Sequence, residues 1–475
     1  MSEIGSMKIG IIGGGPGGYV AAIRAAQLGA EVTLFEKHAL GGVCLNEGCI
    51  PTKALLHTSH LFNESKNAAQ SGVMIPPDQI RLDMVKVQEH KQRIVKKLTD
   101  GVSALLKSGK VAVLRGTASF LAKDTLQLRP EDGGAAQTFR FDKIVVASGS
   151  KPFIPNMPGL EEGFKTGFCL DSTGLLELTA LPEKLLIVGG GVIGIEMASL
   201  FRDLGSKVVV VVGNDEILGT MDHETSKNLR ISLARRGVEI LLKNHMDGLS
   251  MSGGKLVVQV ESPAGLKEYE TDKMLLAIGR RAHIAELNLE AAGVETERGR
   301  IPVNDKQETN VPGIYAIGDC VGQIMVAHVA SAQGEVAVEN ALGHSAAYNG
   351  SLVPSTIHTT PEYAGIGLTE EQLKAEGRDY AVGRFPLLAN GKALMLNGGQ
   401  GMVKILADKG NGGLLGVYMV GPRATDLIHE AAICMHGGGT VKDIINTIHA
   451  HPTVAEAIHE AALAVEKRAI HIINR

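Results

Sequence analysis

The strongest constraint on the fold is a glycine-rich turn that occurs twice in the chain. The first copy reads Gly13-x-Gly15-x-x-Gly18 and the second reads Gly189-x-Gly191-x-x-Gly194. Each turn follows an apolar run, precedes a stretch of helical length and is followed by a second apolar run. Such glycines let the backbone turn tightly, approach a pyrophosphate and pack helix against strand, with the anion at the helix N-terminus. The sequence therefore predicts an α/β protein with two Rossmann-like dinucleotide-binding domains.

The two copies differ at the end of their second strand, where a carboxylate is expected to bind the ribose hydroxyls. The first copy has Glu36 at this position, whereas the second has Val212, eighteen residues after Gly194. The second copy also lacks an arginine that would favour a ribose phosphate. Asp215 or Glu216 from the next loop could replace the carboxylate, so the choice between NAD and NADP stays open.

A close pair of cysteines, Cys44 and Cys49, follows the first copy. Two cysteines at this spacing can close a small ring and reopen as a dithiol. The alternatives are two buried thiols, or half of a metal site whose other ligands are missing from the neighbouring sequence. Because the pair directly follows a nucleotide-binding unit, we interpret it as a redox disulfide that contacts a flavin. The first domain would then hold FAD and the second a nicotinamide nucleotide, and no metal site is predicted.

Composition excludes several classes of protein. The chain has 475 residues and a formal net charge of -4, which argues against nucleic acid or an anionic membrane as a partner. It contains no apolar run of membrane-spanning length and no basic N-terminal segment followed by an apolar one. Its five cysteines include only one close pair, as expected in a reducing compartment. We therefore predict a cytoplasmic protein.

The residues around the cysteine pair resemble a known family. They read Gly41-Gly42-Val43-Cys44-Leu45-Asn46-Glu47-Gly48-Cys49-Ile50-Pro51-Thr52-Lys53. With the two glycine turns, this stretch resembles the pyridine nucleotide-disulfide oxidoreductases, and within them the dihydrolipoamide dehydrogenase branch. The resemblance covers nearly the whole chain and implies a homodimeric, FAD-dependent, NAD-linked enzyme with an α+β C-terminal dimerisation domain. The implied domains are 1–150 for FAD and the redox disulfide, 151–279 for NAD(P), 280–348 completing the FAD site, and 349–475 for dimerisation.

The same resemblance implies roles for residues outside the glycine turns. Lys53 and Glu196 would pair near the flavin and the nicotinamide. Asp319 would hydrogen-bond the ribityl chain of the flavin, and Ala327 and His328 would begin a helix beside the flavin ring. The ordinary alternatives are a surface ion pair for Lys53 and Glu196 and a helix cap for Asp319. We favour the functional roles because each residue accompanies a motif already assigned to the cofactors.

A histidine near the C-terminus, His451, matches the base of the family. Pro452 suits the first turn of a following helix, and Glu456 lies one turn further on. A histidine whose ring is oriented by a carboxylate can act as a general base near neutral pH. We interpret the isolated His436 and His459 as solvated or core residues. In the family this base acts on the active site of the other subunit, so the homodimer is predicted to be required for activity.

The resemblance implies dithiol oxidation as the reaction. A substrate dithiol, deprotonated by His451, would attack Cys44, and Cys49 would pass the electrons to the flavin, which reduces NAD. The implied substrates are dihydrolipoyl groups on the lipoylated E2 of 2-oxo acid dehydrogenase complexes or on the H-protein of the glycine cleavage system.

Two alternative functions stay open. The first is a related flavin reductase for glutathione, another low-molecular-weight disulfide or mercuric ion, although the chain lacks a C-terminal cysteine pair. The second is a non-enzymatic redox-sensing flavoprotein, which would normally lose the thiols or the base.

The chain departs from the branch pattern at three places near the predicted site. Val43 and Glu47 stand where the branch usually has threonine and valine, and Ala147-Ser148-Gly149 replaces Ala-Thr-Gly. We hypothesise that Glu47 raises the pKa of a neighbouring thiol by repulsion between like charges.

Overall fold

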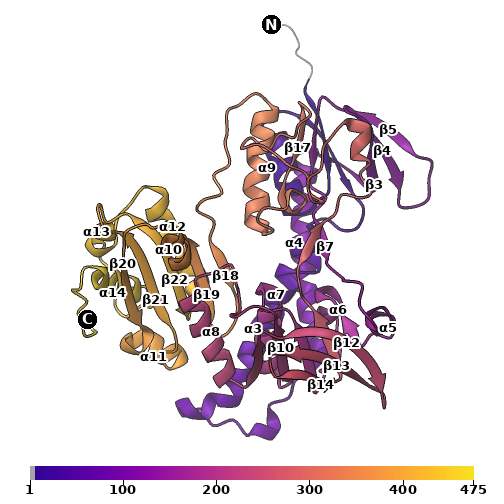
Figure 1. Ribbon diagram of the computed structural model, residues 1–475. Helices are drawn as coiled ribbons and strands as arrows, with labels where there is room; N and C mark the ends of the chain where they lie inside the picture. The colour runs from indigo at the N-terminus through magenta and orange to yellow at the C-terminus, as the bar shows by residue number, and fades with distance from the viewer. Residues whose placement is uncertain (1–5, 475) are drawn as a thin grey trace. The chain divides into compact units, whose positions relative to one another are not determined.

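The computed structural model describes residues 6–474, which form two compact units (Figure 1). The first unit contains the N-terminal residues up to Ala54 together with Gln88–Phe153 and Gly279–Gly350. The second contains Leu55–Val87, Ile154–Ile278 and the residues from Ser351 onward. Both units are therefore built from segments that are distant in sequence. The four predicted domain boundaries stay predictions.

A seven-stranded sheet forms the centre of the first unit. Its order is β17 (Ile314–Ala316), β6 (Lys143–Val146), β1 (Lys8–Ile12), β2 (Glu31–Glu36), β3 (Ala112–Ala122), β4 (Thr125–Pro130) and β5 (Gln137–Arg140). The strands from β17 to β3 are parallel neighbours, and β3, β4 and β5 form an antiparallel meander. Ile12 pairs with Phe35, so β1 and β2 end at the same edge of the sheet. This edge carries both the glycine turn and Glu36.

Close contact between two helices explains the small residues of the first unit. α1 (Pro16–Gln27) packs against α9 (Ala327–Ala341). A Cβ built on Gly17 would lie 3.0 Å from the carbonyl oxygen of Ala330, and one built on Gly334 would lie 2.7 Å from that of Gly17. The other elements of this unit include α2 (Gly42–Asn46), the start of α3 (Cys49–Asn67), most of α4 (Met84–Ser108), and the short pair β7 (Ser150–Pro152) and β16 (Arg280–Ala282).

The second unit contains a parallel sheet that repeats this strand order. Its strands are β8 (Cys169–Leu170), β15 (Lys273–Leu276), β9 (Lys184–Val188), β10 (Lys207–Val212) and β11 (Val238–Leu242). β9, β10, β11 and β15 thus correspond to β1, β2, β3 and β6. α7 (Val192–Leu204) follows the second glycine turn, and α8 (His223–Arg235) leads into β11. β12 (His245–Ser252), β13 (Lys255–Ser262) and β14 (Gly265–Thr271) form a separate antiparallel sheet.

The C-terminal part of the second unit is a five-stranded antiparallel sheet with helices. The strand order is β18 (Ser355–Ile357), β19 (Glu362–Gly367), β22 (Leu414–Gly421), β21 (Met402–Asp408) and β20 (Tyr380–Pro386). Val403 and Ile405 join the apolar cluster of α12 (Ala424–His436) and α14 (Glu456–Val465), whereas Leu406 joins the cluster that contains α8. Because side chains alternate along a strand, α8 covers the opposite face of this sheet. Within residues 6–474 no helix could cross a membrane.

Candidate active site

The two cysteines lie on consecutive short elements of the first unit. Cys44 is in α2 and Cys49 is the first residue of α3, so only Glu47 and Gly48 separate the two helices. Both side chains are half-buried, and both are thiols rather than a disulfide in the structure. Val43, beside Cys44, is exposed. The pair is therefore close enough to the surface to meet a substrate.

Hydrogen bonding and burial control the Cys44 thiol. A hydrogen bond with Cys49, followed by burial and the charge of Cys49, raises the pKa of Cys44, whereas the charge of Lys53 lowers it. Burial and the charge of Cys44 also raise the pKa of Tyr19, on α1. The structure thus brings Cys44, Cys49 and Lys53 together. The thiolate is the species that needs stabilisation here, and Lys53 provides it.

The structure gives no support to the hypothesis that Glu47 raises a thiol pKa. Glu47 ends α2 with its side chain exposed, so solvent screens its charge. The pKa of Cys44 is raised chiefly by its hydrogen bond with Cys49 and by burial, and Glu47 is not among the main causes of the shift.

The first glycine turn has the shape expected of a dinucleotide site. Gly13 has φ 104°, and a Cβ built on Gly18 would lie 1.8 Å from the carbonyl oxygen of Gly13. At Gly15, by contrast, the nearest described atom to such a Cβ would be 3.9 Å away. Gly15 also precedes α1 and has no side chain to cap it, so the first-turn amides can bind a ligand.

The carboxylate of Glu36 faces this turn. Its Oε2 accepts the N–H of Gly14 at 2.7 Å, and its Oε1 accepts the N–H of His38 at 2.7 Å. The side chain is 6% exposed. The backbone thus fixes the position of the carboxylate at the end of β2.

The turn is also in direct contact with the segment that carries the cysteines. The N–H of Gly41 donates to the carbonyl oxygen of Gly14 at 2.8 Å. Gly42 has φ 55°, and a Cβ built on it would lie 2.7 Å from the Cα of Gly15. Gly41 and Gly42 therefore hold the start of α2 against the nucleotide turn, a role that the sequence analysis did not assign to them.

Asp319 belongs to a hydrogen-bonded group that the sequence analysis missed. Ser150 Oγ donates to Asp319 Oδ2 at 2.5 Å and accepts from Arg280 Nε at 2.7 Å. Arg280 Nη2 also donates to the carbonyl oxygen of Ser150 at 2.9 Å. Asp319 lies inside the short helix η4 (Gly318–Val321), whose N-cap is Ile317. Ser150 directly follows Ala147-Ser148-Gly149, the motif considered in the sequence analysis. The residue that could have indicated this hydrogen-bonded group therefore lies one position after that motif.

The start of α9 lies near Asp319 in the fold. Gln333 of α9 is 2% exposed, and its Oε1 accepts the N–H of Gly318 at 2.7 Å. Ala327 is half-buried at the first position of α9, and His328 is exposed beside it. The predicted helix start at Ala327 therefore agrees with the structure, while the roles of Ala327 and His328 beside a flavin stay predictions.

The second glycine turn repeats the geometry of the first. Gly189 has φ 123°, and a Cβ built on Gly194 would lie 2.0 Å from the carbonyl oxygen of Gly189. A Cβ built on Gly191 would meet no described atom within 4 Å. Gly191 precedes α7 without a side chain to cap it. This turn can also accept a pyrophosphate on its open side.

Glu196 lies on α7, two residues after Gly194 of the second glycine turn. It is 3% exposed, and its Oε1 accepts the N–H of His358 at 2.9 Å. The structure therefore shows a buried carboxylate rather than a surface one. The predicted pairing of Lys53 with Glu196 stays a prediction.

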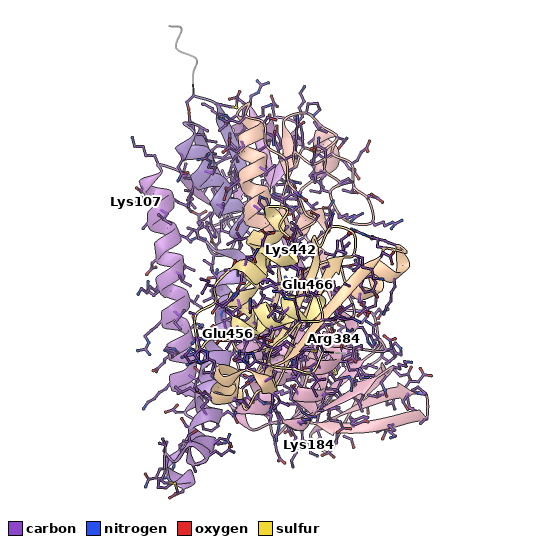
Figure 2. All side chains as sticks on the ribbon, turned by 90° about the vertical axis from the view of Figure 1, so that its left-hand side faces the viewer. Lys107, Lys184, Arg384, Lys442, Glu456 and Glu466 are labelled. Carbon is purple, nitrogen blue, oxygen red and sulfur yellow. The ribbon has the colours of Figure 1, made fainter. Side chains whose placement is uncertain are left out.

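His451 and Glu456 make the predicted contact. His451 Nδ1 lies 2.9 Å from Glu456 Oε1, and the N–H of Thr453 donates to Glu456 Oε2 at 2.8 Å. Burial opposes ionisation of Glu456, but these hydrogen bonds and the charges of His451 and His471 lower its pKa. The His451 side chain is 82% exposed, so Nε2 is accessible. Glu456 is labelled in Figure 2.

Two details near this pair differ from the sequence analysis. The prediction that Pro452 lies in the first turn of the following helix is wrong. α14 begins at Glu456, so Pro452 lies in the preceding loop. The sequence analysis also missed a second pair, in which Nδ1 of His471, beyond the end of α14, lies 2.8 Å from Oε1 of Glu460 on that helix.

Comparison with known proteins identifies the family. Residues 7–334 match the family model described as "Pyridine nucleotide-disulphide oxidoreductase". Residues 353–462 match the model for the dimerisation domain of the same family. The chain belongs to the pyridine nucleotide-disulphide oxidoreductases. It is 43% identical to a dihydrolipoyl dehydrogenase of Thermus scotoductus, with 98% of each chain covered. It is 41% identical to the enzyme of that name from Geobacillus stearothermophilus, over 98% of this chain and 97% of the relative.

A solved structure supports the fold. The Cu(II) complex of the HOCl-induced flavoprotein disulfide reductase RclA from Escherichia coli is 28% identical and has a TM-score of 0.85. It covers 97% of this chain, and this chain covers 99% of it. The predicted fold class is confirmed: two dinucleotide-binding domains and an α+β dimerisation domain. The dimerisation domain also supports the predicted homodimer.

The cofactors of this pyridine nucleotide-disulphide oxidoreductase are FAD and NAD. The first unit fits FAD: Gly15 leaves open backbone for a pyrophosphate, and Glu36 ends the strand beside it. The second glycine turn fits the pyrophosphate of a nicotinamide nucleotide. Its ribose position does not repeat the first, because Val212 has no carboxylate. Residues 6–474 contain no cluster of side chains suited to a metal ion.

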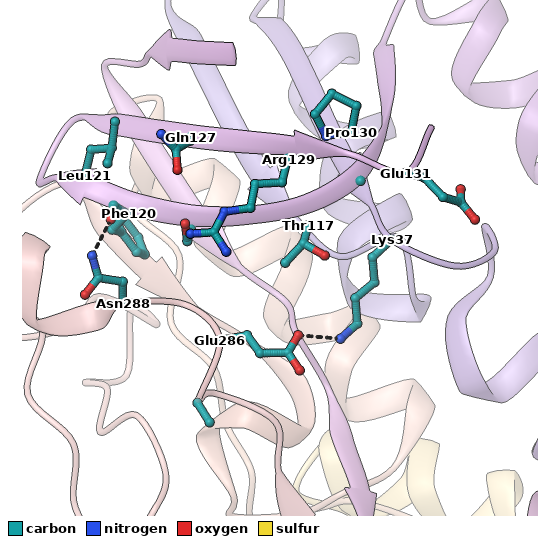
Figure 3. Close-up of a pocket in the computed structure, with 13 residues that line it drawn as sticks. Lys37, Thr117, Phe120, Leu121, Gln127, Arg129, Pro130, Glu131, Glu286 and Asn288 are labelled. Atoms are coloured by element: carbon teal, nitrogen blue, oxygen red, sulfur yellow. Dashed lines mark hydrogen bonds and ion pairs between the residues drawn. The ribbon is translucent and has the colours of Figure 1, made fainter. Parts of the chain in front are cut away.

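A separate cavity of about 640 Å³ lies in the first unit beside the hairpin of β3 and β4 (Figure 3). Lys37, which follows Glu36, lines the cavity, and its Nζ donates a hydrogen bond to Glu286 Oε2 at 2.9 Å. This hydrogen bond lowers the pKa of Glu286 to about 2, although burial opposes the shift. The other lining residues are Gly116, Thr117, Ser119, Phe120, Leu121, Gln127, Arg129, Pro130, Glu131, Ala285 and Asn288. The cavity includes none of the predicted site residues.

Proposed function

We propose that this protein is a dihydrolipoyl dehydrogenase, which oxidises protein-bound dihydrolipoyl groups and reduces NAD. The observation that carries this proposal is the thiol pair Cys44 and Cys49, held against the first nucleotide turn through Gly41 and Gly42. Full-length relatives at 41% and 43% identity are dihydrolipoyl dehydrogenases. Sulfur chemistry next to a dinucleotide turn is what this reaction requires.

The reaction begins with thiol–disulfide exchange at the pair. In the oxidised enzyme Cys44 and Cys49 form a disulfide, and one thiolate of the substrate attacks Cys44. The bond between the two cysteines breaks, and Cys49 leaves as a thiolate. The second substrate thiolate then attacks the substrate sulfur bonded to Cys44, which closes the substrate disulfide and releases Cys44. Two electrons and two protons have then left the substrate.

His451 is the proposed base for both substrate thiols. Its Nδ1 faces Glu456, so the ring donates from Nδ1 and leaves Nε2 to accept a proton. Glu456 stays ionised because its pKa is lowered, and its negative charge stabilises the imidazolium that forms. The charge of Lys53 favours the thiolate form of Cys44 as it is released.

The remaining predicted site residues are proposed to hold the cofactors. Gly13, Gly15, Gly18 and Glu36 would bind FAD, with Asp319 supported by Ser150 and Arg280. Gly189, Gly191 and Gly194 would bind the pyrophosphate of NAD, and Lys53, Glu196, Ala327 and His328 would lie near the reacting rings. Bound FAD supplies the electron path from the dithiol to NAD.

We propose that the physiological substrates are lipoylated E2 of 2-oxo acid dehydrogenase complexes or the H-protein of the glycine cleavage system. The support is the name shared by the full-length relatives. A cytoplasmic location is also proposed, on the basis of one close cysteine pair among five cysteines.

The test is anaerobic turnover of the purified protein, with dihydrolipoamide and NAD compared against glutathione disulfide and NADPH. Each assay is repeated with Cys44→Ser and with Cys434→Ser, which changes a half-buried thiol outside the pair. We expect rapid NADH formation that disappears only in the Cys44 variant. Activity confined to the glutathione assay would assign the protein to the related reductases, and activity in neither assay would favour the sensor.

A further inference from the structure

Glu36 and Val212 occupy equivalent positions in the two dinucleotide units but make different contacts. Glu36 accepts the N–H of Gly14 through its carboxylate. In the second unit, a Cβ built on Gly190 would lie 2.7 Å from Cγ1 and 2.8 Å from Cγ2 of Val212. Val212 is 2% exposed. Its methyl groups therefore fill the space over the turn and cannot accept a hydrogen bond from a ribose hydroxyl.

The nearby acidic residues do not replace the missing carboxylate in the same way. Glu216 is 3% exposed, and its Oε1 accepts from Arg230 Nε at 2.7 Å and from the N–H of Ile217 at 3.0 Å. This buried ion pair corrects our suggestion that Glu216 could bind the ribose. Asp215 is exposed and remains the acidic residue at the edge of this position.

Two basic residues, Lys243 and His245, lie near the loop that follows Val212; Lys243 comes directly after β11. β10 and β11 are parallel with Val212 opposite Leu242, so Lys243 emerges at the same edge as Gly213. The N–H of Lys243 donates to the carbonyl oxygen of Asn214 at 2.9 Å. The N–H of Asn244 donates to the carbonyl oxygen of Val212 at 3.0 Å. The Lys243 segment is therefore fixed against the ribose position.

A histidine ring closes the other side of this loop. A Cβ built on Gly213 would lie 2.7 Å from Cε1 and 3.0 Å from Nδ1 of His245, so the imidazole lies directly over Gly213. Lys243 and His245 are exposed, and their side chains make no hydrogen bond or ion pair with another residue among 6–474. Both can therefore bind an anion at this edge.

We propose that the second unit accepts the 2′-phosphate of NADP as well as the free ribose of NAD, with Lys243 and His245 contacting the phosphate. A carboxylate at position 212 would select NAD by binding the 2′-hydroxyl and repelling a phosphate, and Val212 does neither. The His245 ring, which lies over Gly213, would face the added phosphate. The inference rests on the proposed function only in requiring that the second unit binds a nicotinamide nucleotide.

Calorimetry on the FAD-loaded enzyme tests this without turnover. The two probes are ADP-ribose and its 2′-phosphorylated form. We expect their dissociation constants to lie within about tenfold of each other, and the phosphorylated probe, which carries the additional charge, to weaken more steeply with salt than ADP-ribose. Lys243→Ala should weaken that probe alone by roughly two- to fivefold, as expected for an exposed charge pair. Because Lys243 is exposed, this variant should fold normally.

Substitutions at position 212 give the complementary result. Val212→Glu should weaken the phosphorylated probe by at least about tenfold, because two negative charges would then lie a few ångströms apart. Val212→Thr, which has nearly the same volume and no charge, is the matched control. It should leave the ratio of the two dissociation constants unchanged.

Three results would overturn the inference. One is ADP-ribose binding more than about a hundredfold tighter than the phosphorylated probe. Another is an unchanged ratio in Lys243→Ala, and the third is loss of ADP-ribose binding in Asp215→Asn, which would make Asp215 the missing carboxylate. These outcomes leave the proposed function intact, whereas binding of neither probe would overturn the nucleotide site itself.

Discussion

Lys404 Nζ lies 2.8 Å from Asp222 Oδ2, and neither side chain has any exposed surface. Lys404 is on β21 of the C-terminal sheet, and Asp222 caps α8, whose Thr225 N–H donates to Asp222 Oδ1 at 3.1 Å. Lys404 also lies 3.0 Å from Glu224 and 2.6 Å from Glu370. One buried cation therefore joins a helix of the nucleotide-binding sheet to the antiparallel sheet of the same unit.

Replacing this cation should destabilise the protein strongly. Lys404→Met leaves three neighbouring carboxylates without their central cation, and breaking a buried ion pair in this way costs about 3–5 kcal/mol. Denaturant unfolding measures the loss. Lys409→Met is the matched control, in the turn directly after the same strand: Lys409 lies 3.6 Å from Asp379, both are exposed, and its loss should cost less than about 1 kcal/mol. Equal losses in the two variants would contradict this reading.

The same group predicts how stability depends on pH. Burial alone would raise the pKa of Glu370, but hydrogen bonds from Lys404 and Lys374 outweigh it and lower the pKa to about 2 from its ordinary 4.5. A lowered folded-state pKa stabilises the protein above the unfolded value, and this contribution is lost as the pH falls from about 4.5 toward 2. Unfolding free energies of the unaltered protein and Glu370→Gln should therefore converge over this range. A constant difference would exclude the linkage.

Features that depend on residues close in sequence were predicted correctly. Glu36 at the end of a strand, and the contact of His451 with Glu456, both follow from residues that are close in sequence, and the structure contains both. The contact between Ser150 and Arg280 joins residues 130 positions apart, and no local pattern encodes it. The sequence also gave no indication that Lys404 is buried, because a lysine in a strand is ordinarily solvated, whereas here its ammonium group pairs with Asp222 at the start of α8 and with Glu370.

The glycine turns predict opposite results for two similar substitutions. Gly18→Ala should prevent correct folding, because its Cβ would lie 1.8 Å from the carbonyl oxygen of Gly13. Gly15→Ala should fold, because the nearest atom to its Cβ is 3.9 Å away. Its methyl group would face the proposed pyrophosphate and should weaken FAD binding roughly ten- to a hundredfold, the value of one or two charge-assisted hydrogen bonds. Flavin absorbance per protein after gel filtration measures this, and full flavin content in Gly15→Ala would be the contrary result.

The proposed base predicts a graded loss of activity. His451→Gln removes the proton acceptor and should lower kcat by about 10²–10⁴ without changing flavin content. Glu456→Gln keeps the ring but loses the charge that stabilises the imidazolium, so its loss should be smaller. His436→Gln, which alters an exposed histidine at the end of α12, is the control and should behave as the unaltered protein. Steady-state turnover with dihydrolipoamide and NAD distinguishes these three variants.

The charges around Cys44 predict which neighbour controls the thiolate. Lys53 lowers the pKa of Cys44, so Lys53→Met should raise the pH at which the thiolate forms in the reduced enzyme. Glu47 is exposed and is not among the main causes of the Cys44 shift, so Glu47→Val should leave the titration of Cys44 unchanged. The absorbance of the thiolate–flavin contact, followed against pH, reports both variants. A clear downward shift in Glu47→Val would restore the hypothesis of repulsion between like charges. A shift in Lys53→Met alone would mean that the thiolate depends on the helix that starts at Cys49, rather than on the residues between the two cysteines.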